Sequence, residues 1–400
     1  MSDLFRMEIS KMNKMNFKTP CFILDESEYI NNINAFKRVL NKHFKSYNIG
    51  YSFKTNSLPR LLRIALENGC FAEVVSDDEY ILAEKIGFKN NEIIFNGPVK
   101  SKDIFLKAVH SGSLVNIDSK REIEWLCDDN YSGTIGVRVN FDLESRLPGQ
   151  SSTGKLGGRF GFCYETGDLH EAIATLRTHG IKVSRLHMHV SNASKSIEVY
   201  ECLAEMACKI IEKENLSVNC IDFGGGFFGG GDKGESYERY ISKIQGKLKQ
   251  FGRENIEIII EPGASVVATA FSYCTTVVDT KKTSYGQFVI TDGSRLHVDP
   301  FFVKSNYMVS FPTNEGHSIK QTICGYTCME KDRIMDIDAP LLNVGDGVTY
   351  SIVGSYTMCF NSLFISYLPR VYSKLGNEKY ILVRDAWSVD EYLQKCRWDI

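Results

Sequence analysis

Short hydrophobic runs alternate with longer amphipathic stretches from about residue 19 to residue 265. Runs rich in Val, Ile and aromatic residues are typical of buried strands, whereas hydrophobic residues three or four positions apart are typical of helices. A first strand is expected at residues 19–24, and a helix capped by residues 25–27 follows it to about residue 42. Further strands are predicted at residues 48–54, 71–76, 92–96, 113–118, 134–140, 183–190, 218–224 and 256–261. The predicted helices between them include residues 58–68, 77–86, 102–110, 119–127 and 168–178.

The alternation of strands and helices over residues 48–261 is typical of a (β/α)8 TIM barrel, and we expect that fold. An open, doubly wound sheet would produce the same alternation. Periodicity alone does not distinguish the two, because it does not show whether the sheet closes.

The pattern changes near residue 268, where strand-like segments follow one another with Gly, Asn and Asp turns between them. These strands are predicted at residues 271–278, 286–292, 318–323, 347–352 and 380–384. We therefore expect an N-terminal tail at residues 1–18, a barrel domain at residues 19–265 and a C-terminal, mainly antiparallel β domain at residues 266–400. The strand at residues 19–24 precedes the barrel pattern and could belong to either domain.

Composition favours a globular protein of the cytoplasm. Of the 400 residues 43% are hydrophobic and 24% are charged, and the net charge of −2 gives no reason to expect nucleic acid or a membrane as partner. No apolar run approaches the ~18 residues that a transmembrane helix needs, and residues 1–18 lack the apolar core of a signal peptide. The 12 cysteines include no CxxC pair and are expected to be reduced thiols. Cys324 and Cys328 have no histidine pair nearby, so we expect no metal site.

Lys54 ends the strand at residues 48–54, immediately before a predicted helix. The carboxyl ends of the strands of a (β/α)8 barrel meet on one face, where such enzymes place their catalytic groups. A lone lysine at a strand end is more often a solvated residue. Here, however, many polar, glycine and proline residues would share its face. They are Ser76, Asn96, Gly97, Pro98, Asp118, Arg138, Asn140, His187, His189, Asp222, Gly224, Gly225, Gly226, Glu261, Pro262 and Gly263.

Three of these signals have more than one interpretation. The glycines at residues 224–226 could offer backbone N–H groups to a phosphate or form a plain flexible turn. His187 and His189 are expected on the same side of their strand. They could be core residues, metal ligands or a ring face that packs against a planar cofactor. Glu261 ends an apolar strand, so its carboxylate needs a partner, either a pyridinium N–H or a barrel arginine or lysine.

Several motifs occur in a specific order and spacing, at residues 51–56, 96–100, 186–190, 222–226, 261–263, 328–332, 345–346 and 354–356. In these motifs the sequence resembles the fold-type III pyridoxal-phosphate decarboxylases, the family of the diaminopimelate and ornithine decarboxylases. The resemblance covers nearly the whole chain. It implies an alanine-racemase-like barrel with a β domain, pyridoxal 5′-phosphate (PLP) as cofactor, an amino acid as substrate, and a homodimer with active sites at its interface.

The resemblance also implies roles for the matching residues. Lys54 would bind PLP covalently through its amine until the substrate amine displaces it. His189 would stack on the pyridine ring, and Glu261 would pair with the protonated ring nitrogen. Cys328, reaching across the dimer, would supply a proton after CO2 leaves. The phosphate would be held by Asn192, Gly224, Gly225, Gly226, Gly263 and Tyr356.

Four positions differ from the family pattern. Ala264 replaces the arginine that usually follows Glu-Pro-Gly, and residues 191–192 are Ser-Asn in place of Gly-Ser. Met329 stands where the two named relatives have an acidic residue for the distal amine of the substrate, and a thioether cannot pair with an ammonium. We therefore expect a specialised substrate with a larger or differently charged side chain, in secondary-metabolite or surface-glycan biosynthesis, unless Glu330 replaces the missing acid.

Two other functions remain open from the sequence. A racemase or epimerase shares the fold, but alanine-racemase relatives usually place arginine at the ring nitrogen, so Glu261 favours decarboxylation. Ala264 favours a non-catalytic PLP-binding protein, and the presence of Lys54, Glu261, Cys328 and Tyr356 argues against it.

Overall fold

The computed structural model describes residues 17–192, 194–231, 234–304, 306–312, 316–376 and 379–398. These residues form two compact units, residues 30–266 and the described residues on either side of them. Most of the predicted N-terminal tail, residues 1–16, lies outside the described residues. In the part of the chain that is described, no helix has the length and apolar character needed to cross a bilayer.

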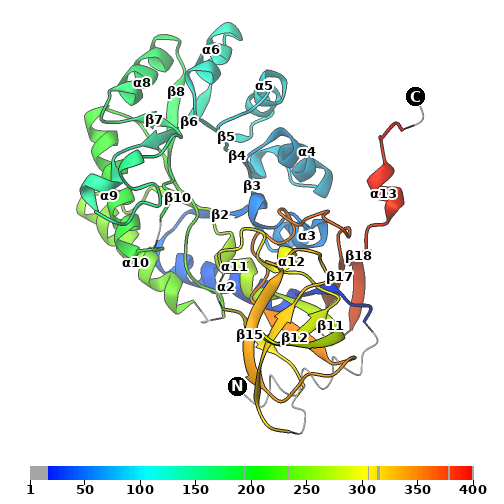
Figure 1. The fold of residues 1–400 in the computed structure, drawn as a ribbon. Helices are drawn as coiled ribbons and strands as arrows, with labels where there is room; N and C mark the ends of the chain where they lie inside the picture. The colour runs from blue at the N-terminus through cyan, green and yellow to red at the C-terminus, as the bar shows by residue number, and fades with distance from the viewer. Residues whose placement is uncertain are drawn as a thin grey trace. The chain divides into compact units, whose positions relative to one another are not determined.

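Residues 30–266 contain a closed barrel of eight parallel strands, which confirms the (β/α)8 fold and excludes the open sheet (Figure 1). Closure is direct, because the last strand pairs with the first through Ile260 opposite Ile49. The barrel strands are β2 (Tyr47–Ser52), β3 (Phe71–Val74), β4 (Ile93–Phe95), β5 (Leu114–Ile117), β6 (Thr134–Asn140), β8 (Lys182–Met188), β9 (Cys220–Phe223) and β10 (Glu257–Ile260). A short strand, β7 (Phe162–Cys163), pairs with the end of β6.

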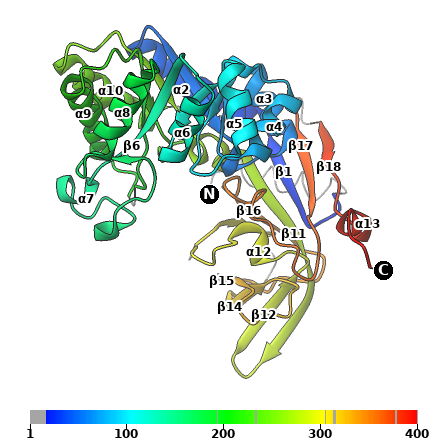
Figure 2. The same ribbon diagram turned by 90° about the horizontal axis from the view of Figure 1, so that it is seen from above.

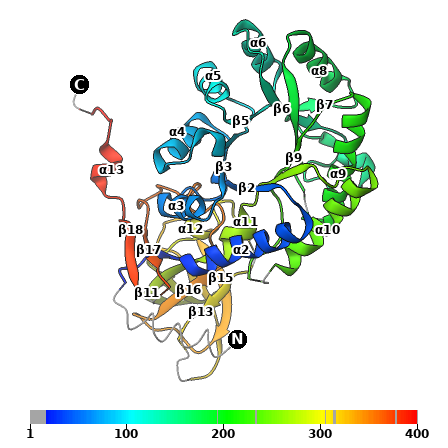
Figure 3. The ribbon, with the colours of Figure 1, turned by 180° about the vertical axis from the view of Figure 1, so that it is seen from behind.

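Helices surround the ring of strands, and Figure 3 shows the last two, α9 and α10, side by side. Each buries an apolar stripe: in α8 the buried residues Leu169, Ala172, Ile173 and Leu176 are three or four positions apart. The surrounding helices are α3 (Pro59–Glu67), α4 (Asp77–Ile86), α5 (Lys102–His110), α6 (Lys120–Asp128), α8 (Asp168–Thr178), α9 (Ile197–Lys213) and α10 (Glu235–Gln250). Short helices α7 (Leu143–Arg146) and α11 (Ala264–Val267) follow β6 and β10.

The expected helix caps are present at the ends of the barrel strands. At the start of α4, Ser76 Oγ accepts a hydrogen bond from the backbone N–H of Glu79 (3.2 Å). At the start of α6, Ser119 and Glu122 form a capping box. These two caps end the loops after β3 and β5 in a defined conformation.

The second unit is a mainly antiparallel sheet built around the long strand β11 (Phe271–Thr283), whose hairpin with β12 (Gly286–Thr291) is visible in Figure 2. The strand expected at residues 19–24 lies in this sheet as β1 (Cys21–Asp25), antiparallel to β11 and parallel to β17. The other strands are β13 (Met308–Ser310), β14 (Ile319–Cys324), β15 (Arg333–Ala339), β16 (Gly347–Ser351), β17 (Arg370–Lys374) and β18 (Tyr380–Arg384). The remaining helices are α2 (Glu26–His43), α12 (Arg295–Val298) and α13 (Val389–Leu393).

Candidate active site

Lys54 lies in a single 3-10 turn, η1 (Phe53–Thr55), directly after β2. Its Nζ donates a hydrogen bond to Oε2 of Glu73 on β3, at 2.6 Å. Desolvation lowers the pKa of the Lys54 amine, but the negative charges of Glu73 and Glu261 outweigh it, and the pKa lies above its ordinary value. Lys54 is therefore held as an ammonium beside carboxylates at the carboxyl end of the barrel.

Glu73 is a residue of this site that the sequence analysis missed. It is 1% exposed, and besides Lys54 it accepts hydrogen bonds from Ser52 Oγ (2.5 Å) and Asn96 Nδ2 (3.1 Å). The available signal was a single glutamate inside the apolar strand at residues 71–75, because a buried carboxylate without partners is costly.

Glu261 follows β10 and is 2% exposed. Its Oε1 accepts a hydrogen bond from Asn96 Nδ2 at 2.6 Å, and its Oε2 lies 3.5 Å from His187 Nε2. Burial raises the pKa of Glu261, and the positive charge of Lys54 partly offsets that effect. Among the described residues, no arginine or lysine forms an ion pair with Glu261, so its carboxylate can accept from a cationic ligand.

Amide side chains connect Glu261 to a second buried carboxylate, that of Asp222 on β9. Asn116 Nδ2 donates to Asp222 Oδ2 (2.9 Å) and to Asn96 Oδ1 (2.8 Å), and Asn116 Oδ1 accepts from Arg185 Nε (2.9 Å). Burial raises the pKa of Asp222 well above its ordinary value, and the nearby charge of Glu261 raises it further. The interior below the site is therefore a continuous polar network in which Asn96 and Asn116 fix the carboxylates.

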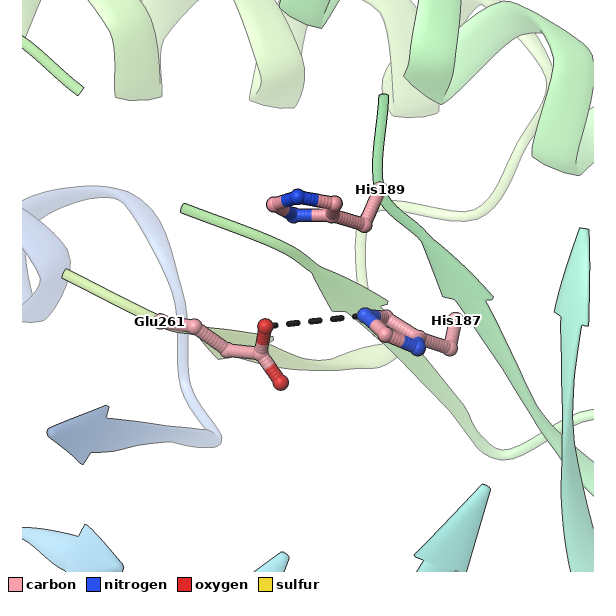
Figure 4. Close-up of side chains that lie close together, drawn as sticks. All are labelled: His187, His189 and Glu261. Atoms are coloured by element: carbon pink, nitrogen blue, oxygen red, sulfur yellow. Dashed lines mark ion pairs between the residues drawn. The ribbon is translucent and has the colours of Figure 1, made fainter. Parts of the chain in front are cut away.

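His187 and His189 extend from β8 toward Glu261, as Figure 4 shows. The two imidazole centroids are 6.0 Å apart. Neither ring nitrogen of His187, nor Nδ1 of His189, has a hydrogen-bond partner among the described residues. Burial lowers the pKa of both histidines well below the ordinary value, and the charge of Arg138 adds to the effect, so both rings are neutral.

The loop after β9 requires glycine for close packing. A Cβ on Gly224 would lie 2.0 Å from His189 Nδ1, and one on Gly225 would lie 2.7 Å from the carbonyl oxygen of Glu261. Gly226 has a φ of +104°, which favours glycine. The backbone at residue 224 therefore passes directly beside the imidazole of His189. The N–H of Gly224 donates to the carbonyl oxygen of Met188 (3.0 Å), so the N–H groups of Gly225 and Gly226 are the ones that could bind an anion.

Two more of the predicted phosphate-binding residues lie in loops of the barrel unit. A Cβ on Gly263 would lie 2.1 Å from Thr55 Oγ1, so glycine is needed where this loop meets η1. Asn192 Oδ1 accepts from the backbone N–H groups of Ser194 (3.1 Å) and Ser196 (3.3 Å). The Asn192 side chain thus fixes its own loop before α9.

Cys328 and Tyr356 belong to the β unit. Cys328 is an exposed free thiol, and Tyr356 is 37% exposed with a φ of +64°. The turn that carries Cys328 is fixed by Asp332, which is 2% exposed and accepts from Thr327 Oγ1 (2.6 Å) and Ser294 Oγ (3.0 Å).

Met329 and Cys328 line a groove of the β unit over strands β12, β14 and β15. Glu330, the possible replacement for the missing acid, has a 94% exposed side chain and lies 3.2 Å from Arg333 Nη2. Its carboxylate therefore already has a cationic partner.

The barrel residues fit a planar cofactor that carries a ring nitrogen and a phosphate. Glu261 offers a buried acceptor and Lys54 offers an amine, and the backbone at residues 225–226 offers donors in the loop that passes beside the imidazole of His189. PLP, when bound, supplies an electron sink for the negative charge that remains at the α-carbon of an amino acid after CO2 leaves.

Comparisons with known proteins agree with this fit. Residues 30–268 match the family described as "Pyridoxal-dependent decarboxylase, pyridoxal binding domain". The diaminopimelate decarboxylase of Methanothermobacter thermautotrophicus is 26% identical over 94% of this chain and 91% of its own. The L-glutamyl-[BtrI acyl-carrier protein] decarboxylase of Niallia circulans is 27% identical over 97% of this chain and 96% of its own. Among solved structures, the diaminopimelate decarboxylase of M. jannaschii has the same fold, with a TM-score of 0.84 and 22% identity over 98% of this chain and 94% of its own.

Proposed function

This chain belongs to the pyridoxal-dependent decarboxylases, and we propose that it removes the α-carboxylate of a specialised amino acid rather than of ornithine or diaminopimelate. PLP is its cofactor, and its reaction is the decarboxylation of an amino acid. The proposal concerns the substrate class and the residues that carry the reaction.

The barrel face supports an assignment of three roles. Lys54 would hold the cofactor through its amine. Glu261, fixed by Asn96, accepts a hydrogen bond from the ring nitrogen and keeps that nitrogen protonated. His189 lies against the ring, with its orientation limited by the glycine backbone beside it.

The phosphate is proposed to bind at the backbone N–H groups of Gly225, Gly226 and Gly263, with Asn192 and Tyr356 adding polar groups. The N–H of Gly224, expected to take part, instead donates to Met188, so the role of Gly224 is to make room beside His189. Backbone N–H groups suit this task because they need no counter-charge of their own. Ala264 offers no positive charge to the phosphate. Binding therefore depends more on backbone N–H groups than it would with an arginine at this position.

Cys328 is proposed to donate the proton that replaces the carboxylate, from a partner subunit in a cytoplasmic homodimer. Its thiol is exposed and forms no disulfide. All 12 cysteines are free thiols, as in proteins of a reducing compartment.

Met329 is the observation that carries the substrate proposal. It lines the same groove as Cys328 and offers no charge, while the neighbouring Glu330 is paired with Arg333. An ammonium at the end of the substrate would therefore have no acidic partner at this position. The Niallia circulans relative acts on a glutamyl group attached to a carrier protein, which gives a precedent for a substrate with a large tail.

The test is a panel of amino acids assayed for CO2 release, with and without a neutral or large group at the distal end. We expect turnover of one of these and little turnover of ornithine, lysine or diaminopimelate. The variant Met329→Glu should raise kcat/KM for diaminopimelate or ornithine by roughly tenfold or more, because it restores a charged partner for the distal amine. Met329→Leu is the matched control and should give no gain. Efficient turnover of diaminopimelate by the unaltered protein would contradict the proposal.

A further inference from the structure

His187 has no part in the proposed function, although it is 2% exposed and points at Glu261. Both of its ring nitrogens lack a hydrogen-bond partner among the described residues. A buried imidazole with two unsatisfied nitrogens is costly unless something else satisfies them. The two unsatisfied nitrogens of His187 therefore suggest that this part of the barrel binds a ligand other than the cofactor.

We propose that the cofactor-free protein binds one divalent transition-metal ion of the zinc class through His187, His189 and Glu261. We further propose that this ion and PLP exclude each other, a statement that rests on the proposed function.

The geometry of the three side chains suits such an ion. One ligand atom from each residue lies within 4.8 Å of the other two, and Figure 4 shows His187 and Glu261 pointing at each other with His189 beside them. The His187 Nε2 to Glu261 Oε2 distance is 3.5 Å. Metal–ligand bonds of about 2.0–2.1 Å at tetrahedral angles place two ligand atoms about 3.3 Å apart, so small side-chain rotations are sufficient.

The chemistry of the three groups narrows the choice of ion. Two imidazoles and one carboxylate form the ligand set of catalytic zinc sites, in which water completes the tetrahedron. Imidazole nitrogens favour zinc, copper and nickel, whereas magnesium and calcium prefer sites made of oxygen ligands.

Mutual exclusion follows from the shared residues. In the proposed function, Glu261 binds the ring nitrogen and His189 lies against the ring, so neither can ligate a metal while the cofactor is bound. A metal in this position would block loading of the cofactor. Zinc would then act as an inhibitor of PLP reconstitution and not of the loaded enzyme.

The experiment uses the full chain in its PLP-loaded and PLP-free forms. Each form is equilibrated with zinc, passed through a desalting column and analysed for metal by mass spectrometry. We expect about one zinc more per chain in the PLP-free form than in the loaded form. Equal metal content in the two forms would overturn the exclusion, and the absence of zinc from the PLP-free form would overturn the site itself.

Cobalt serves as a spectroscopic probe, because the protein has 12 cysteines and thiolates are also zinc ligands. Cobalt at the proposed site should show tetrahedral d–d bands without sulfur-to-cobalt charge transfer. A sulfur-to-cobalt charge-transfer band whose intensity accounts for all of the bound cobalt would assign the metal to thiolates and contradict the proposal.

The variant His187→Asn should weaken zinc binding by roughly tenfold or more, because it removes one of three protein ligands. Its absorbance with PLP reports separately whether the barrel still binds the cofactor, which distinguishes failure of this inference from failure of the proposed function. The matched control is His170→Asn, since His170 is an exposed histidine of the same unit that pairs with Glu214. Unchanged zinc affinity in His187→Asn would overturn the proposal.

Discussion

The charge on Lys54 depends on the residues around it. Its ammonium donates to Glu73 at 2.6 Å, and the charges of Glu73 and Glu261 hold the pKa of Lys54 above the ordinary value. Only the unprotonated amine attacks the aldehyde of the cofactor. Glu73 therefore stabilises the position of Lys54 while opposing the loss of its proton in the cofactor-free protein.

Glu73→Gln tests this balance. The amide keeps the size of the side chain and can still accept from Ser52, but it removes a negative charge beside Lys54. The pKa of Lys54 should fall, so the pH profile for attachment of PLP to the cofactor-free protein should shift to lower pH. Stopped-flow absorbance across a pH series measures the profile. Glu84→Gln, on a partly exposed residue paired with Lys107, should leave the profile unchanged. An unshifted profile in Glu73→Gln would refute the assigned role.

Glycine at residue 224 is required by a single contact. In Gly224→Ala the new Cβ would meet His189 Nδ1 at 2.0 Å, so the imidazole must move. We expect PLP affinity to fall by roughly tenfold or more, measured by absorbance titration. The control is Gly246→Ala. Gly246 lies at an exposed position in the middle of α10, and no atom lies within 4 Å of the new Cβ. It should keep PLP affinity and raise the free energy of unfolding by about 0.5–1 kcal/mol, and equal PLP affinity in the two variants would contradict the account.

Residues at strand ends could be predicted from the sequence, as could His187 and Asp222 within β8 and β9, whereas two other residues within strands could not. Lys54, His189 and Glu261 each end a hydrophobic run, and the topology of a barrel brings such ends to one face. Glu73 and Asn116 lie within their strands, where the direction of the side chain depends on the register. Their function as hydrogen-bond partners became visible only when β3 and β5 had known neighbours.

At the scale of elements, loops after the strands are fixed by buried charge. Lys100, in one of the family motifs, has a fully buried side chain and donates to the carbonyl of Gly97 (2.7 Å) and to Glu122 Oε1 (2.5 Å). Glu122 also accepts from the backbone N–H of Asp118 (2.7 Å) at the start of α6. This pair connects the loop after β4 to the loop after β5, so the motif has a structural use.

Lys100→Met should therefore be strongly destabilising. Methionine fills a similar volume but leaves the buried Glu122 carboxylate without its cation, which costs about 3–5 kcal/mol. Urea denaturation measures the free energy of unfolding. Lys102→Met is the control, because the exposed ion pair of Lys102 with Asp128 is worth about 0–1 kcal/mol. A loss for Lys100→Met no larger than the loss for Lys102→Met would show that the buried pair is not needed.

Three strands of the β unit were missed, and two of them have a clear cause. In β15, Arg333, Asp336 and Asp338 are exposed and alternate with buried residues, so the segment lacks a hydrophobic run. In β17, only Val371 and Ser373 of five residues are buried, and one of these is polar. Such strands are recognised by their backbone partners more than by their composition. Nothing in the three residues of β13 marks them as a strand.

At the scale of the whole molecule, closure of the barrel was beyond the sequence. The pairing of β10 with β2 joins segments about two hundred residues apart, and no local pattern reports it. Subunit assembly is likewise not reported by a local sequence pattern, because an active site shared between subunits depends on a partner chain. The proposed homodimer therefore needs a test that depends on two subunits.

Subunit complementation provides that test. Lys54→Ala and Cys328→Ala should each be nearly inactive, because they remove the amine and the proton donor that we propose for the reaction. If each site combines Lys54 of one subunit with Cys328 of the other, co-expression of the two variants should restore about a quarter of wild-type kcat. Assays of CO2 release on the co-purified protein measure the recovery. If the co-purified protein is as inactive as the two single variants, then either both residues act within one chain or one of them takes no part in the reaction.

The central claim is that Lys54 binds PLP, and one measurement tests it most directly. The purified protein is treated with borohydride, its absorbance is recorded before and after, and the modified peptide is identified by mass spectrometry. We predict a visible band that borohydride removes, a phosphopyridoxyl group on Lys54, and no such band in Lys54→Ala. A colourless protein that PLP does not reconstitute, or a label on another lysine, would contradict the account.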